Sequence, residues 1–281
     1  MISNSTSLGA QRNLMQTQSA MSGSIARLSS GLRINQAADD AAGMGISARM
    51  QADIRSVGQA ERNANDGISM IQIAEGAMNE QHGILNRLRE LAVQSSNGAL
   101  SNNERAFIDT EHDQLVSELD RISGATEFNS FNMLGADAGT FAMQIGKDAV
   151  AGTDTIDVVF TATDATTLGV NAMDFSTAAG SQTALGTIDT AIDALSTNRA
   201  TLGASQNRLS VTVQNLRTEE ENLVAANSRI RDVDVARETA ALTKGQIMSQ
   251  ATSTSLMREL AATRFYSSVR RFCTVTERRF C

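Results

Sequence analysis

The sequence lacks the residues that most often interrupt helices or cross-link small domains. Proline and tryptophan are absent from its 281 residues, tyrosine occurs once, and the two cysteines, Cys273 and Cys281, both fall in the last ten positions. Without proline, no residue forces a break in a long helix. Without further cysteines, residues 1–272 cannot carry a disulfide framework. These absences favour long continuous helices and exclude a disulfide-stabilised main body.

Concentrated positive charge and long apolar runs are also missing. The formal net charge is −7, and the lysines are limited to Lys147 and Lys244, while the arginines are scattered among acids. This distribution argues against a nucleic-acid partner. The first twenty residues lack the apolar core of a cleaved signal peptide, and no apolar run is long enough to cross a bilayer. We therefore expect no membrane insertion and, if the protein is extracellular, export by a dedicated machine.

Apolar residues recur every seven positions in two stretches of the chain, which predicts two long partner helices. A strict heptad repeat keeps one seam of a helix against a neighbouring helix. In the earlier stretch, Ile46, Ile54 and Ile68 are expected to widen the apolar stripe. The two repeats are Met50, Val57, Ala64, Ile71, Met78, Leu85 and Ala92, and Ile188, Leu195, Leu202, Leu209, Leu216, Leu223 and Ile230. The predicted bundle seam consists of Val57, Ile71, Met78 and Leu85 facing Leu195, Leu202, Leu209 and Leu216.

The remaining segments complete a mainly α fold. A third, shorter helix follows the break at residues 96–98 and ends near Gly124. Between Phe128 and about Ser181, the runs FAMQIG and TIDVVF predict a hairpin or small sheet. The predicted fold is an elongated antiparallel helical bundle or coiled coil built from both chain ends, with a small β-hairpin region in the middle.

The two ends of the chain carry weaker apolar stripes. Leu14, Met21 and Leu28, with Ile25 and Leu32 beside them, form a thin face near the start. Near the end, a similar face consists of Val235, Leu242 and Leu256. Such helices gain little from propensity alone and need a neighbour to remain ordered. The predicted organisation is a terminal helix over 1–42, bundle helices and hairpin over 43–180, a returning helix over 181–234 and a second terminal helix over 235–281.

Several long motifs resemble the bacterial flagellin family. SSGLRINQAADDAAGMGIS at 29–47 is similar to the family's N-terminal signature, and NLVAANSRIRDVDVARETAALTKGQIMSQA at 222–251 to its C-terminal signature. LRELAVQSSNG at 88–98 and ELDRISGATEFN at 118–129 continue the match. The resemblance implies a short flagellin without large variable outer domains. Residues 1–42 and 235–281 would then line the filament core.

The resemblance also implies a function and a set of partners. Flagellins are structural subunits that self-assemble into the extracellular flagellar filament used for motility. They pass unfolded through the flagellar secretion apparatus without a cleaved signal peptide. An export chaperone, the filament cap and hook-junction proteins are the implied partners besides further copies of the chain.

One surface resembles a recognition site for an immune receptor. The run 86–94 is similar to the stretch that a flagellin-sensing Toll-like receptor recognises in family members, and Glu111 matches a further contact. The resemblance implies Arg87, Leu91, Gln94 and Glu111 as candidate contacts, exposed in the monomer and buried between protofilaments. For pure structure, a solvated face around one core leucine would suffice.

Other kinds of function find little support in the residues. The adjacent Asp39 and Asp40 point about 100° apart on a helix, so they are poorly placed to act on one substrate atom. His82 and His112 have no metal-ligand spacing, and the scattered glycines form no phosphate loop. We expect no enzyme, cofactor or metal site. A hook–filament junction protein and an exported coiled-coil adhesin stay open as alternatives.

The tail departs from the family after about Leu256. It carries six arginines and four of the ten aromatic residues, where family members usually end in an almost uncharged helix. An altered reading frame and a natural variant both account for such a tail. If it is helical through both cysteines, the Cα atoms of Cys273 and Cys281 lie about 12 Å apart, too far for a disulfide. We predict no intrachain bridge, and poorer polymer packing because of the added positive charge.

Overall fold

The computed structural model describes residues 5–148, 150 and 152–276. Helices dominate the described chain, and the mainly α fold class predicted from the sequence is confirmed. The elements are α1 (Ser5–Ser30), α2 (Ala41–Ser95), α3 (Asn102–Ala125), β1 (Glu127–Phe128), β2 (Phe131–Asn132), β3 (Thr140–Gln144), β4 (Thr155–Val159), α4 (Ala178–Arg231) and α5 (Val235–Thr276).

The chain divides into two compact units. The first combines residues 1–51 with 224–281, and the second consists of residues 52–223. The long helices α2 and α4 contribute residues to both units. The sequence predicted four segments whose boundaries lie at or near helix ends. The boundaries of the compact units lie instead well within helices, after residues 51 and 223.

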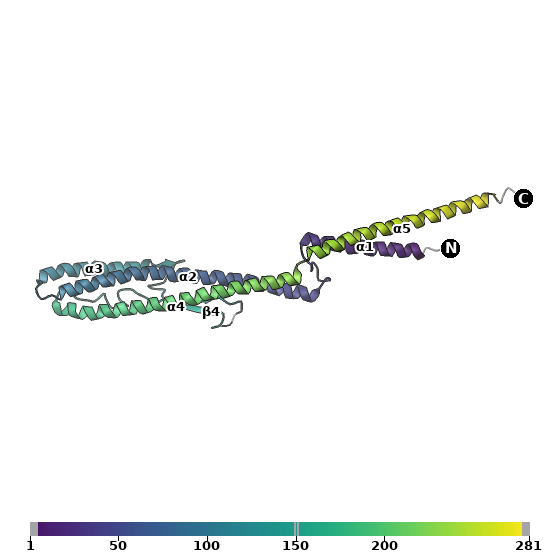
Figure 1. Cartoon of the computed structure of the whole chain (residues 1–281). Coiled ribbons are helices and arrows are strands. Elements are labelled where there is room, and N and C mark those ends of the chain that lie inside the picture. Colours follow the sequence, from purple (N-terminus) through teal and green to yellow (C-terminus); the bar gives the residue numbers. More distant parts are fainter. Residues whose placement is uncertain (1–4, 149, 151, 277–281) are drawn as a thin grey trace. The chain divides into compact units, whose positions relative to one another are not determined.

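In the second unit, α2 and α4 run antiparallel along a common apolar seam (Figure 1). All eight predicted seam residues are buried, with at most 7% of each exposed. Three ion pairs join the two helices beside the seam: Glu61 with Arg217, Glu75 with Arg199 and Arg89 with Asp189. From the first pair to the last, the residue number rises along α2 and falls along α4. This order shows that the two helices are antiparallel.

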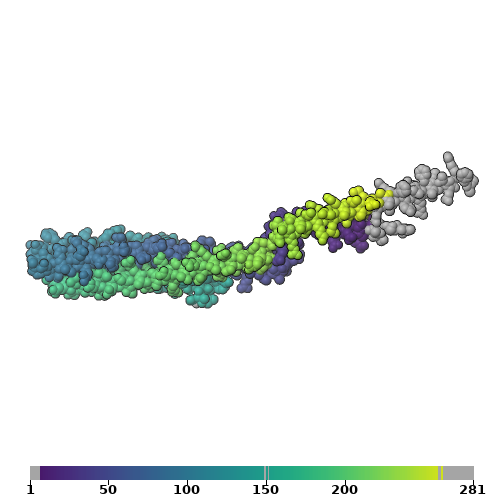
Figure 2. All heavy atoms as spheres, in the orientation of Figure 1, coloured from purple at the N-terminus to yellow at the C-terminus, as the bar shows by residue number. Residues whose placement is uncertain are grey.

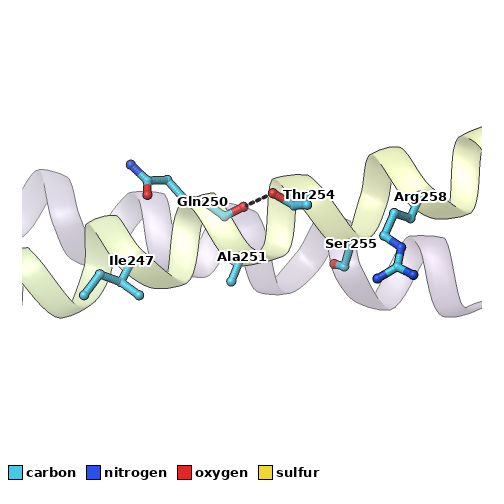
Figure 3. Close-up of a pocket in the computed structure, with 6 residues that line it drawn as sticks. All are labelled: Ile247, Gln250, Ala251, Thr254, Ser255 and Arg258. Carbon is cyan, nitrogen blue, oxygen red and sulfur yellow. Dashed lines mark hydrogen bonds between the residues drawn. The ribbon is translucent and has the colours of Figure 1, made fainter.

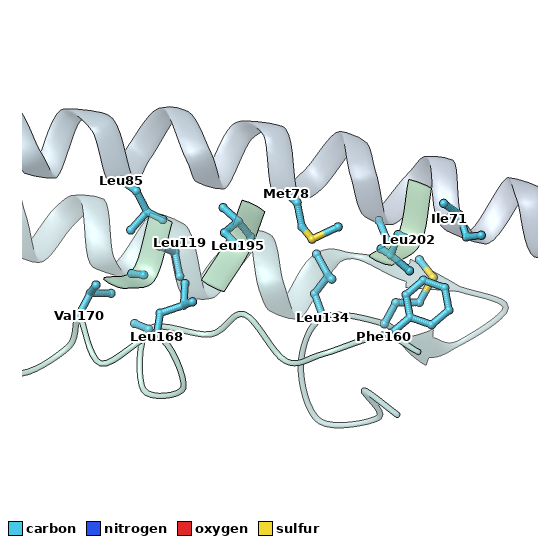
Figure 4. Close-up of a cluster of buried hydrophobic side chains, with 14 of the residues drawn as sticks. Ile71, Met78, Leu85, Leu119, Leu134, Phe160, Leu168, Val170, Leu195 and Leu202 are labelled. Carbon is cyan, nitrogen blue, oxygen red and sulfur yellow. The ribbon is translucent and has the colours of Figure 1, made fainter. Parts of the chain in front are cut away.

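The core of the second unit also includes the non-helical segment 160–175. In Figure 4, Leu168 and Val170 lie beside Leu119 of α3, and Phe160 lies near Ile71 of α2. Phe160 and Val170 are almost completely buried. The atoms of α2 and α4 adjoin one another along this unit in the space-filling view (Figure 2). This segment therefore packs along α3 and belongs to the same apolar core.

Two small hairpins lie between α3 and α4. The pairing of β3 with β4 joins Thr140 to Val159 and Gln144 to Thr155, which confirms the hairpin predicted from the runs FAMQIG and TIDVVF. The pairing of β1 with β2 leaves a two-residue turn at Asn129 and Ser130, whose φ angles are 50° and 68°. Tight hairpins favour positive φ at both central residues because it matches the strand twist.

The third helix begins where its sequence caps it. Ser101 Oγ accepts a hydrogen bond from Glu104 N at 3.4 Å, and Glu104 Oε2 accepts one from Ser101 N at 2.7 Å. This capping box satisfies two backbone donors reciprocally. The hydrogen bond from Ser101 N is the largest cause of the lowered pKa of the Glu104 carboxyl group.

In the first unit, α1 and α5 lie side by side (Figure 1). A Cβ added at Gly245 of α5 would lie 3.8 Å from Cβ of Met21, an ordinary van der Waals distance, so the two helices are in contact here. Arg27 Nη1 lies 3.4 Å from Glu238 Oε1 across the pair. Leu14, Met21 and Leu28 are only partly covered, as expected for a thin apolar stripe.

The structure corrects the predicted position of Ile46 and describes only part of the tail. Ile46 does not widen the buried stripe, because it is 51% exposed, and the neighbouring Ser47 is buried and donates to Asn227 Oδ1 at 2.7 Å. Adjacent helix residues point about 100° apart, and at this position of α2 Ser47 faces inward while Ile46 faces solvent. The helix α5 continues to Thr276. Cys281 lies outside the described residues, so the predicted absence of a disulfide between Cys273 and Cys281 stays a prediction.

Candidate functional site

The candidate receptor face is an ion-pair network that joins α2 to α3. Arg87 donates from Nε and Nη2 to Glu111 Oε1 at 2.9 and 2.7 Å, and from Nη1 to Glu90 Oε2 at 2.9 Å. The hydrogen bond with Glu111, followed by that with Glu90, raises the pKa of the Arg87 guanidinium. Nearly half of the Arg87 and Glu111 side chains is exposed, and Gln94 is also exposed. The structure thus brings three of the four candidate contacts to the surface.

Leu91, the fourth candidate, lies beneath this face. It is 1% exposed and belongs to the apolar core of the second unit. Its side chain therefore offers almost no surface for direct contact in this structure. We reinterpret it as a support that holds the turn of α2 carrying Arg87 and Gln94. Truncating it would create a core cavity rather than remove only a surface contact.

The adjacent carboxylates Asp39 and Asp40 bind backbone groups. Asp39 Oδ2 accepts from Asn35 N and Gln36 N, both at 3.1 Å, and the bond from Asn35 is the largest cause of its lowered pKa. Asp40 Oδ1 accepts from Gly43 N at 2.8 Å and so caps the start of α2. Both carboxylates thus have structural hydrogen bonds at the α1–α2 connection.

The two histidines also have structural partners. His112 is 1% exposed, its Nε2 lies 3.3 Å from Val170 O, and its ring packs on Phe175 at a centroid distance of 4.6 Å. His82 Nδ1 lies 3.0 Å from Asn86 Nδ2 on the same helix. Within residues 5–148, 150 and 152–276, no three or more His, Cys, Asp or Glu side chains form a group suited to a metal ion.

The terminal helices expose large apolar side chains despite their mutual packing. On α1, Met15 is 69% exposed and Ile25 51% exposed; on α5, Ile247 is 62% exposed and Met257 66% exposed. Isolated apolar residues are common on protein surfaces, and these four all lie on the paired helices α1 and α5. None of the helices in the described part of the chain combines the length and apolarity needed to span a membrane.

An open groove follows one face of α5 in the first unit. It has a volume of about 610 Å³, and Figure 3 shows its lining side chains. Thr254 Oγ1 donates a hydrogen bond to Gln250 O at 2.8 Å. The lining is apolar at Ile247, carries a cation at Arg258 and has mostly small side chains between them. The lining consists of Ile247, Gln250, Ala251, Thr254, Ser255 and Arg258.

Sequence reasoning did not identify Arg105 as an important residue. Only 6% of it is exposed, and it donates from Nε to Ser95 O and from Nη2 to Asn97 O, both at 2.9 Å. The guanidinium therefore caps the carbonyl end of α2 from the start of α3. A buried arginine at the beginning of an otherwise polar helix has no periodic signal that would distinguish it from solvated arginines.

Comparison with known families accounts for both ends of the chain. Residues 2–138 match the family model described as the bacterial flagellin N-terminal helical region, and residues 185–263 match the bacterial flagellin C-terminal helical region. The second match extends to residue 263, so the family resemblance does not end near Leu256 as the sequence reading suggested.

Relatives match over almost the entire chain. A flagellin from Halalkalibacterium halodurans is 45% identical over 246 residues, covering 87% of this chain and 88% of the relative. The flagellar filament 33 kDa core protein of Treponema phagedenis is 40% identical over 284 residues, covering 95% of this chain and 98% of the relative.

Solved structures show the same kind of fold. The crystal structure of Bacillus cereus flagellin is 29% identical and has a TM-score of 0.50, covering 59% of this chain and 94% of that chain. A Vibrio parahaemolyticus chain described as a flagellar hook-associated protein has a TM-score of 0.58 at 12% identity, covering 69% of this chain and 100% of that chain, so it shows the fold alone. With the two family matches and the relatives at 40–45% identity, this chain belongs to the bacterial flagellin family.

Proposed function

We propose that this protein is a structural subunit that assembles with copies of itself into the filament of a bacterial flagellum, through the helices α1 and α5. The observation that carries this proposal is the set of exposed apolar side chains on the paired terminal helices. A helix pair with thin mutual contacts and apolar outer faces gains burial when further copies pack around it. Its location is the flagellum, on the outside of the cell.

Single substitutions test the proposal without unfolding the monomer. Met15→Ser and Ile247→Ser each remove an apolar side chain that is more than half exposed. We expect unchanged circular dichroism and thermal midpoint, with a reduced yield of sedimentable polymer. Met15→Leu and Ile247→Leu keep the apolar character and should polymerise like the parent. Equal polymer yields from the serine and leucine variants would contradict assembly through this surface.

Deletion of residues 1–40 tests the role of the first helix as a whole. Without α1, the thin apolar face of α5 loses its partner within the chain. The second unit retains its own core, so the truncated protein should be a helical, soluble monomer. Filaments formed by this deletion variant would refute assembly through the paired terminal helices.

The export route and the accessory partners belong to the same proposal. The chain passes unfolded through the flagellar secretion apparatus, with an export chaperone bound to its C-terminal region. It then contacts hook-junction proteins and the filament cap. The absence of proline supports this route, because no slow prolyl isomerisation delays refolding after export.

A second candidate function is recognition of the monomer by a flagellin-sensing Toll-like receptor. The exposed network of Arg87, Glu111 and Gln94 supports it, since planar guanidinium and carboxylate groups offer directional contacts. Arg87→Ala should lower signalling in receptor reporter cells, while Arg121→Ala, which breaks the separate surface pair with Glu118, should not. Equal signalling by the Arg87→Ala variant and the parent protein would reject this role. Leu91→Ala is unsuitable as a contact probe because it also opens the core.

A further inference from the structure

We propose that Asn97 is a site of spontaneous deamidation, and that the folded turn between α2 and α3 accelerates the reaction. Asn97 precedes Gly98, and this is the single Asn-Gly dipeptide in the sequence. Both residues are exposed to solvent. The modification depends on local chemistry alone and does not rest on filament assembly.

The reaction is an intramolecular attack followed by hydrolysis. Gly98 N loses its proton to hydroxide and forms a bond to Cγ of Asn97, the bond from Cγ to the side-chain nitrogen breaks, and ammonia leaves after taking up a proton. The product is a five-membered cyclic imide. Water then adds to one of its two carbonyl groups and opens the ring, giving either aspartate or isoaspartate, in which the main chain runs through Cβ. No oxidant or reductant is required.

The attacking nitrogen is accessible. A Cβ added at Gly98 would meet nothing within 4 Å, so the approach to this residue is sterically open. In the described part of the chain, Gly98 N donates no hydrogen bond, whereas Ser96 N and Asn97 N bond to preceding carbonyls. The N–H group of Gly98 can therefore lose its proton without first breaking a hydrogen bond.

The Asn97 side chain is held in a bent conformation that favours ring closure. Its Oδ1 accepts a hydrogen bond from Ala99 N at 3.1 Å. In such a turn the side chain folds back over the following backbone, which brings Cγ towards the nitrogen of the next residue. The same hydrogen bond stabilises negative charge that develops on Oδ1 during the attack, because a fixed backbone donor acts there as an oxyanion hole does.

Arg105 stabilises the other negative charge of the reaction. When the peptide nitrogen of Gly98 loses its proton, the charge is shared with the carbonyl oxygen of Asn97 through amide resonance. That oxygen accepts hydrogen bonds from Arg105 Nη2 at 2.9 Å and from Leu100 N at 3.2 Å. A nearby cation and two donors favour the anionic form of the peptide, so a larger fraction of the chain is ready to attack.

A second dipeptide of similar chemistry provides an internal contrast. Asp66-Gly67 could form the same imide, but it lies inside α2, where helix geometry fixes the backbone. A Cβ at Gly67 would lie 3.2 Å from Leu209 Cδ1, so this glycine is packed against α4. We expect no isoaspartate at residue 66 under conditions that convert Asn97.

The test follows deamidation of the full chain at alkaline pH. Tryptic cleavage after Arg89 and Arg105 yields one peptide, residues 90–105, in which fragment masses separate Asn97 from Asn102 and Asn103. Enzymatic methylation of isoaspartate provides a second readout. We expect conversion of Asn97 before other asparagines, and several-fold faster in the folded chain than in the chain unfolded in urea. A slower reaction in the folded chain, or a major product at another asparagine such as Asn129, would overturn the proposal.

Variants separate the contributions of the turn. Asn97→Gln should abolish the product, and Gly98→Ala should slow it in folded and unfolded chains alike, because the added methyl group hinders attack. Arg105→Lys keeps a positive charge but loses the fork of donors, so the folded-state rate should fall towards the unfolded rate. Asn102→Ala removes only the Nη1 contact at 3.3 Å and should leave the rate near that of the parent. Equal folded-state rates for the parent and the Arg105→Lys variant would contradict acceleration by the guanidinium. If the Arg105→Lys variant does not fold, as judged by circular dichroism, the comparison of the folded parent with the unfolded parent decides.

Discussion

Replacing Leu209 with alanine is expected to lower the free energy of unfolding by about 3 to 4 kcal/mol, the middle of the range for leucines in rigid cores. Leu209 is fully buried in the α2–α4 seam. The loss has two parts, the apolar area returned to water and the cavity that remains. The cavity should persist because two long helices held by ion pairs on either side of this position cannot easily move together.

Gly67 allows a sharper version of this test. A Cβ at Gly67 would lie 3.2 Å from Leu209 Cδ1 and 3.2 Å from Met143 Cγ, so Gly67→Ala alone crowds the seam. Leu209→Ala removes one of these two close contacts and leaves the one with the flexible Met143 side chain, so the added methyl group should be tolerated better. The double variant should therefore be more stable than the sum of the two single losses predicts, by about 1 kcal/mol.

Urea unfolding followed by circular dichroism measures all three variants. Val211→Ala is the matched control, because Val211 lies two residues further along α4 and is 57% exposed. Its loss should be below about 0.5 kcal/mol. If Leu209→Ala were no more destabilising than Val211→Ala, or if Gly67→Ala and Leu209→Ala were strictly additive, the α2–α4 seam would not have the described packing.

Three further perturbations have defined outcomes. The pKa of Glu104 is lowered in the folded state, so its capping contribution to stability is present above pH 4.5, the ordinary pKa, and is lost as the pH falls through the lower folded pKa. In unfolding measured against pH, the stability difference between the parent and Glu104→Gln should shrink over that range. Gly43→Ala should lower the thermal midpoint because the new Cβ would lie 2.7 Å from Cδ1 of the buried Ile34, whereas Gly45→Ala, with open space around it, should not lower it. Replacing Arg264, Arg271 and Arg278 with glutamine should raise the yield of sedimentable polymer, and an unchanged yield would show that tail charge does not impair packing.

Periodic features of the fold could be predicted from the sequence. The heptad spacing identified α2 and α4 because both helices bury one continuous stripe, and the Ser96-Asn97-Gly98 break separated α2 from α3. The alternating pattern around Ile156 and Val158 predicted the strand β4, since alternate residues face the core. These elements have a repeating relation between sequence and burial, and that relation is visible without coordinates.

Features without a period were missed. Leu168 and Phe175 complete the core from an irregular segment, where no spacing distinguishes buried from exposed residues. The turn at Asn129 and Ser130 carries no glycine to mark its positive φ angles. The candidate receptor face was predicted by resemblance, and the sequence left Leu91 open as either a receptor contact or a core leucine. The packing of α2 places it in the core.

Electron cryomicroscopy of polymer grown from the purified full chain tests assembly through the terminal helices most directly. We predict helical filaments in which Met15 of α1 and Ile247 of α5, both mostly exposed in the single chain, are buried against neighbouring copies. Filaments in which both side chains remain in contact with solvent would contradict this mode of assembly. So would a chain that stays monomeric both with its tail unchanged and with the three tail arginines replaced by glutamine.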